Sequence, residues 1–226
     1  MNFSTERPYL LLFGILAFVG LVADQASKYV VFASLYPADD HEVQSVKPVI
    51  PGAFSLRTLY SFKRDPGDEP MSFLRNISGE RLPYVNRGAL FGIGNAEGEN
   101  EDGEKKGWNL PFAIVSVLAA IFIVVWASRP AVAGDRFLCM ALGLILAGTL
   151  GNLYDRIVFS GVRDFLHCYY DRHVWPDFNI ADCCLVCGAG VLLVHSFFVK
   201  ESAAASKPEA VAVEAPLPTT APSNGA

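Results

Sequence analysis

Charged residues are scarce in this chain. Only 18% of its 226 residues are Asp, Glu, Lys or Arg, whereas 52% are apolar, and soluble domains carry about a quarter charged residues. Most of the charge lies between residues 39 and 106, where acids and bases mix, so the net charge of −5 says little. No face is basic enough to suit nucleic acid. The scarcity argues against an ordinary soluble domain, and we expect no nucleic-acid partner.

The sequence also lacks the patterns of a metal centre or of a Ser or Cys hydrolase. Its five cysteines include one CxxC spacing, at Cys184 and Cys187, but no second ligand pair lies nearby. The four histidines show no metal-ligand spacing, and no Ser or Cys has a His/Asp partner arrangement. We therefore expect no metal and no cofactor, and cysteines that pack as small apolar side chains.

Long windows nearly free of charge are what the sequence has instead. About 18 apolar residues can cross the roughly 30 Å hydrocarbon core of a bilayer as a helix. Windows that qualify, or nearly do, are residues 9–35, 110–128, 137–154 and 180–199. The first could be a cleaved signal peptide, but its hydrophobicity resumes after Lys28, so a retained helix is preferred. The sequence predicts an all-α polytopic membrane protein with four transmembrane helices.

A long polar segment, residues 36–108, separates the first two windows. Residues 46–59 mix β-branched and aromatic residues with Pro-Gly, which predicts short strands. Residues 61–83 and 95–107 are rich in Gly, Pro and charge, which is typical of loop insertions. The chain thus divides into a membrane domain, residues 1–200, and an Ala- and Pro-rich tail, residues 201–226, that we expect to be disordered.

The orientation in the membrane is only weakly marked. Positive charge in short connections favours the cytoplasm, and it lies near Arg7, in residues 129–136 and at Lys200. We therefore expect both termini to be cytoplasmic. The first and third connections must then share the opposite face.

Two aspartates should meet at that face. Asp155 ends the third window and Asp182 begins the fourth, so both lie at similar depth. Two carboxyls held close together can share one proton, as in aspartic proteases, so that one activates water and the other polarises a peptide carbonyl. Taken singly, Asp155 could be an interfacial charge paired with Arg156, and Asp182 a helix N-terminal acid. Together, flanked by Asn152 and Asn179, they favour chemistry.

Asp24 and Lys28 are four residues apart in the first window and can pair on one helix face. Structural support is the preferred role of this pair. Two other classes of function stay open. A proton-coupled transporter would carry polar residues through the membrane depth, and a non-catalytic scaffold would tolerate Asn at Asp155 and Asp182.

Five short motifs resemble those of the lipoprotein signal peptidase (signal peptidase II) family and occur in the same order. They are DQASK (24–28), NRGALFGI (86–93), GNLYDRI (151–157), GVRDF (161–165) and FNIAD (178–182). The resemblance implies four transmembrane helices and a small extracytoplasmic β-cradle between the first two. It also implies an aspartic peptidase of the bacterial inner membrane, with its active site facing the periplasm.

The substrate implied by the resemblance is a prolipoprotein whose Cys carries diacylglycerol, cut just before that Cys. The enzyme would need no cofactor or metal, would meet its substrate within membrane lipid, and is expected to be a monomer. Carried over by motif, the catalytic pair is Asp155 and Asp182. Residues expected to bind substrate or order the site are Asn86, Gly88, Asn152, Arg156, Asn179, Asp24 and Lys28.

Overall fold

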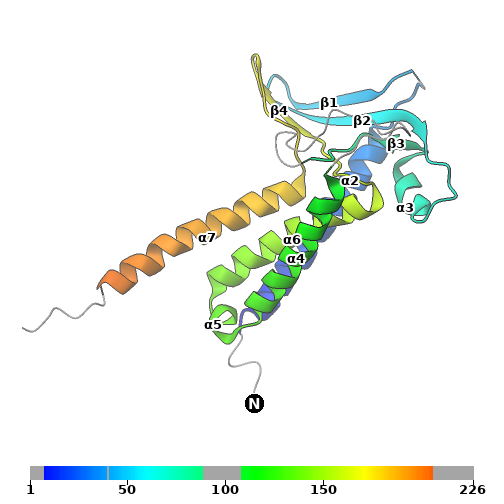
Figure 1. Cartoon of the computed structure of the whole chain (residues 1–226). Coiled ribbons are helices and arrows are strands. Elements are labelled where there is room, and N and C mark those ends of the chain that lie inside the picture. The colour runs from blue at the N-terminus through cyan, green and yellow to red at the C-terminus, as the bar shows by residue number, and fades with distance from the viewer. Residues whose placement is uncertain (1–7, 40, 89–107, 206–226) are drawn as a thin grey trace, which may run out of the picture.

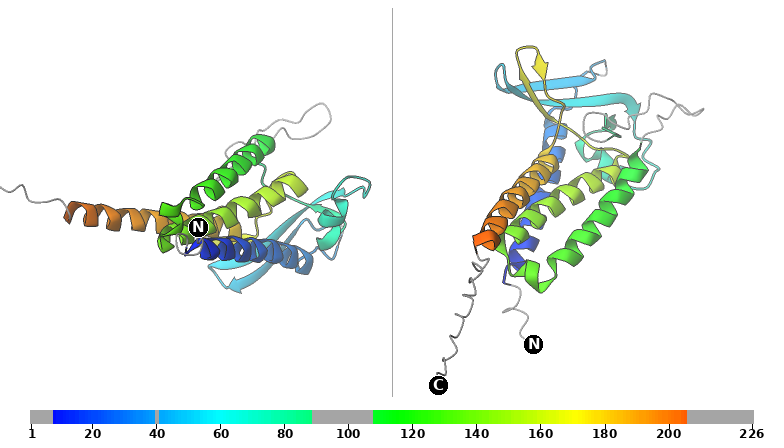
Figure 2. Two further views of the ribbon diagram at one scale, coloured as in Figure 1. Left: turned by 90° about the horizontal axis from the view of Figure 1, so that it is seen from below. Right: turned by 60° about the vertical axis from the view of Figure 1, so that its left-hand side comes forward.

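Four long helices form the body of the protein in the computed structural model, which describes residues 8–39, 41–88 and 108–205 (Figure 1). They are α2 (Leu10–Ser34), α4 (Asn109–Ala127), α6 (Arg136–Val158) and α7 (Ile180–Ala205). All four are long and apolar enough to cross a membrane, which confirms the four predicted spans. The first residues of α2 and the last part of α7 lie at the end of the bundle away from the sheet (Figure 2).

Helix α6 is the central helix of the bundle. It packs against α2, α4 and α7, and more than half of its most apolar window is buried, against less than a fifth in the other spans. Asp135 caps its first turn by accepting hydrogen bonds from the backbone N–H groups of Phe137 (2.8 Å) and Leu138 (3.1 Å). The short helix α5 (Pro130–Ala133) links α4 to this cap.

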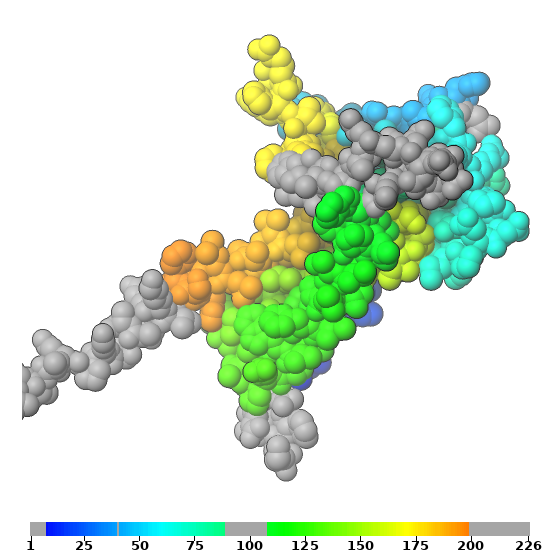
Figure 3. All heavy atoms as spheres, in the orientation of Figure 1, coloured from blue at the N-terminus to red at the C-terminus, as the bar shows by residue number. Residues whose placement is uncertain are grey.

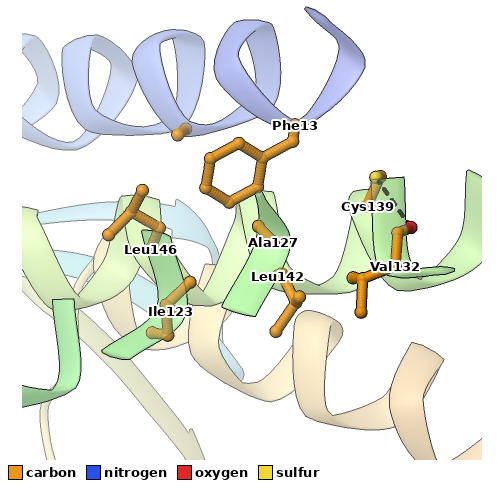
Figure 4. Close-up of a cluster of buried hydrophobic side chains, with 8 residues drawn as sticks. Phe13, Ile123, Ala127, Val132, Cys139, Leu142 and Leu146 are labelled. Carbon is orange, nitrogen blue, oxygen red and sulfur yellow. Dashed lines mark hydrogen bonds between the residues drawn. The ribbon is translucent and has the colours of Figure 1, made fainter. Parts of the chain in front are cut away.

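The core between these helices lies toward the end of the bundle away from the sheet (Figure 4). Phe13 of α2 fits among Ile123 and Ala127 of α4 and Leu142 and Leu146 of α6. Lipid tails are as apolar as these side chains, so close packing rather than escape from water stabilises helix association in a bilayer. Small residues at the contacts allow that packing.

Gly148 and Gly151 bring α6 into contact with the first turn of α7 and with α2. A Cβ atom on Gly148 would overlap the carbonyl oxygen of Ala181, and one on Gly151 would lie 2.6 Å from Asp24 Oδ2. At either position a Cβ atom would come too close to the neighbouring oxygen for any side chain to fit. These two glycines therefore set how closely three helices approach one another beside the polar residues.

An antiparallel sheet covers one end of the bundle (Figure 1). Its strands are β1 (Gln44–Ile50), β2 (Phe54–Arg64), β3 (Arg81–Pro83), β4 (Leu166–Tyr170) and β5 (His173–Val174). The order is β1-β2-β4-β5, with β3 also pairing with β2. In the register, Val46 faces Arg57 and Leu56 faces Leu166.

This sheet corrects two expectations. The protein is not all-α, and the sheet is not confined to the connection between the first two helices, because β4 and β5 come from the connection between α6 and α7. The physical reason is pairing: β4 satisfies the backbone hydrogen-bonding groups on the side of β2 that β1 leaves open. Both connections together build the sheet.

Residues 61–83, expected to be a loop insertion, contain ordered elements. They hold the end of β2, the short helix α3 (Ser72–Arg75), the 3-10 turn η1 (Asn76–Ser78) and β3. Asp65 links them by an ion pair with Arg75 and by accepting a hydrogen bond from Ser72 Oγ (2.8 Å).

The hydrogen bond from Arg75 lowers the pKa of Asp65 to about 2, so this link stays charged at all physiological pH values. The expectation for residues 95–107 lies outside the described residues. Helix α7 runs to Ala205, past the predicted start of the tail at residue 201, and residues 206–226 are also outside the described part.

Gly148→Ala is expected to lower the free energy of unfolding by about 1–3 kcal/mol, because its methyl group would force α6 and α7 apart. Gly190→Ala on α7 is the matched control, since nothing lies within 4 Å of a Cβ atom there. Thermal unfolding of the purified variants in detergent micelles measures the difference. Equal unfolding temperatures for the two variants would show that the helix contact at Gly148 is not tight.

Candidate active site

A cavity of about 800 Å³ opens beneath the sheet, between α4 and α7, with α6 as its floor. Figure 3 shows α4 and α7 diverging, with atoms of α6 exposed between them. The apolar part of the wall includes Phe112, Val115 and Ala119 of α4 and Leu185 of α7. The polar part lies under the sheet and includes Arg57, Asn86, Asn152, Arg156, Asp164, Asp177 and Asp182. The cavity is therefore apolar along the helices and carries both acids and arginines at the sheet end.

Asp164 and Asp182 lie in this wall, linked through two asparagines. Asn179 Nδ2 donates to Asp164 Oδ1 (2.7 Å) and to Asn152 Oδ1 (3.2 Å), and Asn152 Nδ2 donates to Asp182 Oδ1 (2.8 Å). These hydrogen bonds orient both carboxyl groups, which line the same cavity. Both acids are partly exposed, so water or a substrate can reach them.

Asp182 has its place at the start of α7 because of a reciprocal cap. Its backbone N–H donates to Asn179 Oδ1 (3.1 Å), while the N–H of Asn179 donates to Asp182 Oδ2 (3.2 Å). This is the geometry of a capping box. The role of a helix N-terminal acid, which the sequence left open for Asp182, is thus present, and the same residue also lines the cavity.

Asp164 has an unusual affinity for protons. Withdrawal from bulk water, and secondly the neighbouring Asp182 carboxylate, raise the pKa of Asp164 to about 7. Hydrogen bonds from Asn179 and from Asn86 Nδ2 (3.3 Å) act in the opposite direction but do not outweigh these causes. At neutral pH a proton is therefore readily held, or lost, at this position.

Asp155, by contrast, is fully buried. Its Oδ2 accepts hydrogen bonds from the backbone N–H (2.9 Å) and Nε (3.2 Å) of Arg163 and lies 3.4 Å from Lys28 Nζ. Its Oδ1 accepts from Arg163 Nη2 (2.9 Å) and from Gln25 Nε2 (3.3 Å). Both oxygens are engaged in buried ionic hydrogen bonds, so this carboxylate is placed to stabilise the fold.

Arg163 is the main partner of Asp155, and Arg156 is not. The Arg163 side chain is fully buried and its guanidinium lies over the rings of Phe159 (3.9 Å) and Tyr29 (4.3 Å). A planar guanidinium suits this combination of paired hydrogen bonds and ring stacking. Because Arg163 directly precedes Asp164, its anchoring also holds the backbone of the acid in the cavity wall.

Asp24 and Lys28 pair on α2, with 2.8 Å between Lys28 Nζ and Asp24 Oδ2. Both side chains are fully buried. Asp24 Oδ1 also accepts the backbone N–H of Ala181 (2.9 Å), the residue that directly precedes Asp182. Two acids, Asp24 and Asp155, and two bases, Lys28 and Arg163, thus form a neutral buried group, called here the ion cluster.

Arg156, Asn86 and Gly88 bring the first connection to the cavity. Arg156 Nη2 donates to the carbonyl of Gly88 (3.0 Å), and its guanidinium lies over the Phe112 ring (5.0 Å). Asn86 exchanges backbone hydrogen bonds with Val162 (both 2.8 Å) and accepts the Gly88 N–H at its side-chain oxygen (3.0 Å). These three residues order the wall beside Asp164.

The structure thus brings most of the residues predicted from the sequence into one region but separates the expected catalytic pair. Asn86, Gly88, Asn152, Arg156 and Asp182 line the cavity, and Asn179 bridges its acids. Asp24, Lys28 and Asp155 lie behind it in the ion cluster. Asp164 was missed in the sequence because it lies outside the four apolar windows, although it stands within the GVRDF motif.

Arg163→Met is expected to lower the free energy of unfolding by about 3 kcal/mol, since the buried Asp155 carboxylate would lose its main partner. Arg172→Met is the matched control, because that side chain is 94% exposed and its removal should change stability by less than about 0.5 kcal/mol. Thermal unfolding in micelles compares the two variants. An unfolding temperature of Arg163→Met equal to that of the control would show that Asp155 does not depend on Arg163.

Comparison with known proteins links these features to one family. The family model described as signal peptidase (SPase) II matches residues 78–198. Lipoprotein signal peptidase of Maridesulfovibrio salexigens is 30% identical over 185 residues, which cover 82% of this chain and 94% of that protein. Lipoprotein signal peptidase of Pseudoalteromonas translucida is 41% identical over 91 residues, 40% of this chain and 55% of that protein, so the chain spans about half the length of this relative.

A solved structure described as a bacterial membrane enzyme, studied by the in meso method, aligns with a TM-score of 0.57 and 21% identity. The alignment covers 87% of this chain and 92% of that one, and at this identity it speaks for the fold alone. The protein is therefore a multi-pass membrane protein with a known fold. Because the family model matches more than half of its residues and one relative is covered almost end to end, the chain belongs to the lipoprotein signal peptidase (signal peptidase II) family.

Proposed function

We propose that this protein is a membrane-embedded aspartic endopeptidase that removes signal peptides from diacylglyceryl-modified prolipoproteins by cleaving just before the lipidated Cys. The observation that carries the proposal is the hydrogen-bonded chain from Asp164 through Asn179 and Asn152 to Asp182 in the cavity wall. Family membership supports the reaction, and the cavity supports its location.

The two acids divide the proton work between them. Asp164, whose pKa is raised to about 7, holds the shared proton, and Asp182 is the ionised partner. Asp182 takes a proton from a water molecule as the water oxygen bonds to the carbonyl carbon, while Asp164 gives its proton to the carbonyl oxygen. Collapse of the tetrahedral intermediate breaks the C–N bond: the proton taken up by Asp182 passes to the leaving amine, and one hydroxyl of the intermediate returns a proton to Asp164, which restores both acids. The pair titrates jointly, so its apparent pKa values belong to both acids.

Geometry favours Asp164 over Asp155 as the partner of Asp182. Asp155 is enclosed by Lys28 and Arg163 and has no exposed surface, so a water molecule held by Asp182 cannot reach it without breaking the ion cluster. Asp164 shares Asn179 with Asp182 and faces the same cavity. The pairing of Asp155 with Asp182, expected from the sequence, is the alternative. Mutation of each acid distinguishes the two pairings.

The shape of the cavity supports a substrate that arrives through lipid. A signal peptide is a membrane helix, and the lipidated Cys carries acyl chains, so both can enter sideways between α4 and α7 along the apolar wall. The scissile bond would then lie under the sheet, beside the acids. In this proposal the sheet and the site face the periplasm from the bacterial inner membrane, both termini are cytoplasmic, and a monomer suffices. The steps proposed use no metal or cofactor.

Asp164→Asn and Asp182→Asn are each expected to reduce cleavage by about 10³-fold or more, because proton transfer at one end of the reaction is lost. Asp155→Asn is expected to lower the unfolding temperature, while the folded fraction still cleaves. The measurement is release of signal peptide from a diacylglyceryl-modified prolipoprotein in mixed micelles, expressed per folded enzyme after size-exclusion chromatography.

The same three variants separate the alternatives. If folded Asp155→Asn were inactive and Asp164→Asn retained turnover, the catalytic pair would be Asp155 and Asp182. If all three variants cleaved normally, the aspartic mechanism would be wrong, and a scaffold or transport function would have to be considered.

The pH dependence of kcat/KM should follow the protonation of Asp164. Its raised pKa keeps the proton in place below about pH 7, so kcat/KM is expected to fall as the pH rises through that value, by about tenfold per unit well above it. Initial rates at low substrate concentration across that range measure this limb. A profile that stays flat from about pH 6 to about pH 9 would contradict the role of Asp164 as the proton-holding acid.

A further inference from the structure

The segment between β2 and β3 carries an exposed apolar surface at the level of the helix ends. It comprises residues 71–78, that is Met71, α3 and η1, and is called here the 71–78 turn. Phe73 is 72% exposed and Ile77 is 58% exposed. These two residues stand four apart, spanning α3 and η1. The turn thus presents two large apolar side chains to its surroundings.

The 71–78 turn is attached to the ends of two membrane spans. Ser78 Oγ donates to the carbonyl of Tyr29 in α2 (3.3 Å), and Arg75 Nη1 donates to the carbonyl of Val158, the last residue of α6 (3.4 Å). Both acceptors belong to the candidate spans Leu10–Ser34 and Arg136–Val158. The turn therefore lies beside two of the apolar helices, at their sheet-side ends.

Internal contacts hold the backbone of the turn in the orientation that leaves Phe73 and Ile77 exposed. Asp65 holds Arg75 and Ser72, and the ring of Tyr36 packs directly against Gly79, whose φ of 134° suits glycine. A Cβ atom on Gly79 would overlap that ring. The outward direction of Phe73 is therefore built into the fold.

We propose that the 71–78 turn is a lipid-contact element, with Phe73 and Ile77 inserted at the headgroup–acyl boundary on the sheet side of the bilayer. Val30, one residue after the Tyr29 carbonyl that anchors the turn to α2, is 65% exposed as well. Trp108, 56% exposed at the start of α4, marks the same boundary, because tryptophan is enriched at membrane interfaces. Aromatic side chains are well suited to this depth.

This contact would hold the sheet against the membrane surface from the side of α2. The 71–78 turn lies between β2 and β3, and β2 pairs with β1, β3 and β4. Fixing one end of β2 to the bilayer would thus limit tilting of the whole sheet over the cavity. The inference concerns lipid contact alone and does not depend on the proposed peptidase activity.

The test uses the full chain in phosphatidylcholine nanodiscs, with 4-trifluoromethylphenylalanine introduced at one position at a time. Phe73 is the test position. Phe122, 63% exposed on α4, is the lipid-facing reference, and Tyr170, 78% exposed in the β4–β5 hairpin that rises away from the helices (Figure 1), is the water-facing reference. Fluorine NMR compares signal loss caused by doxyl-labelled phosphatidylcholine with loss caused by a water-soluble gadolinium chelate.

Phe73 is expected to follow Phe122, with a lipid-to-water ratio of signal loss about tenfold or more above that of Tyr170. All three side chains are exposed, so the substitutions should leave the fold intact. A ratio at Phe73 equal to that at Tyr170 would place the turn in water and overturn the inference. Weak signal loss with both probes would show that protein covers Phe73 and would overturn it as well.

Discussion

The ion cluster of Asp24, Lys28, Asp155 and Arg163 joins α2, α6 and the chain that follows α6. Ionised side chains inside a membrane protein need partners, because a single charge removed from water is strongly unfavourable. Here two acids and two bases neutralise one another, and all four side chains are fully buried. Removing any one of them would leave a partner charge without compensation. The relative positions of these segments are therefore tightly constrained.

The ion cluster also fixes the backbone beside both acids of the proposed catalytic pair, because each acid directly follows a residue that the cluster holds. Arg163, held by Asp155, directly precedes Asp164, and Ala181, whose N–H is held by Asp24, directly precedes Asp182. The cluster is charged and fully buried, whereas the pair beside it is polar and partly exposed. In the proposed mechanism the structural acid and the chemical acids thus differ in surroundings rather than in residue type, which is a general way that proteins divide roles between carboxyl groups.

The surroundings of the site match a substrate that never leaves the membrane. The cavity is apolar where it passes between α4 and α7 and polar only under the sheet, so acyl chains and a peptide bond would each find suitable walls. Both connections on this side contribute to the sheet, which lets residues far apart in the chain, such as Asn86 and Asp164, meet at its edge. Lipid contact at the 71–78 turn would hold the sheet at a fixed height above the bilayer.

Local patterns in the sequence determined the four spans, the pairing of Asp24 with Lys28 and the gathering of polar residues at one end of the bundle. Hydropathy and the four-residue spacing act within single helices, so they can be read without tertiary structure. Only the tertiary structure decided that Asp164, and not Asp155, faces the cavity with Asp182. Asp155 directly follows the apolar window at residues 137–154, whereas Asp164 lies in the connection after α6, so hydropathy alone pointed to Asp155. The direction of a side chain depends instead on which partners enclose it, and the partners of Asp155 come from α2 and from Arg163. The place of β4 in the sheet could not be read from the sequence for the same reason, because β4 pairs with β2, more than a hundred residues earlier in the chain.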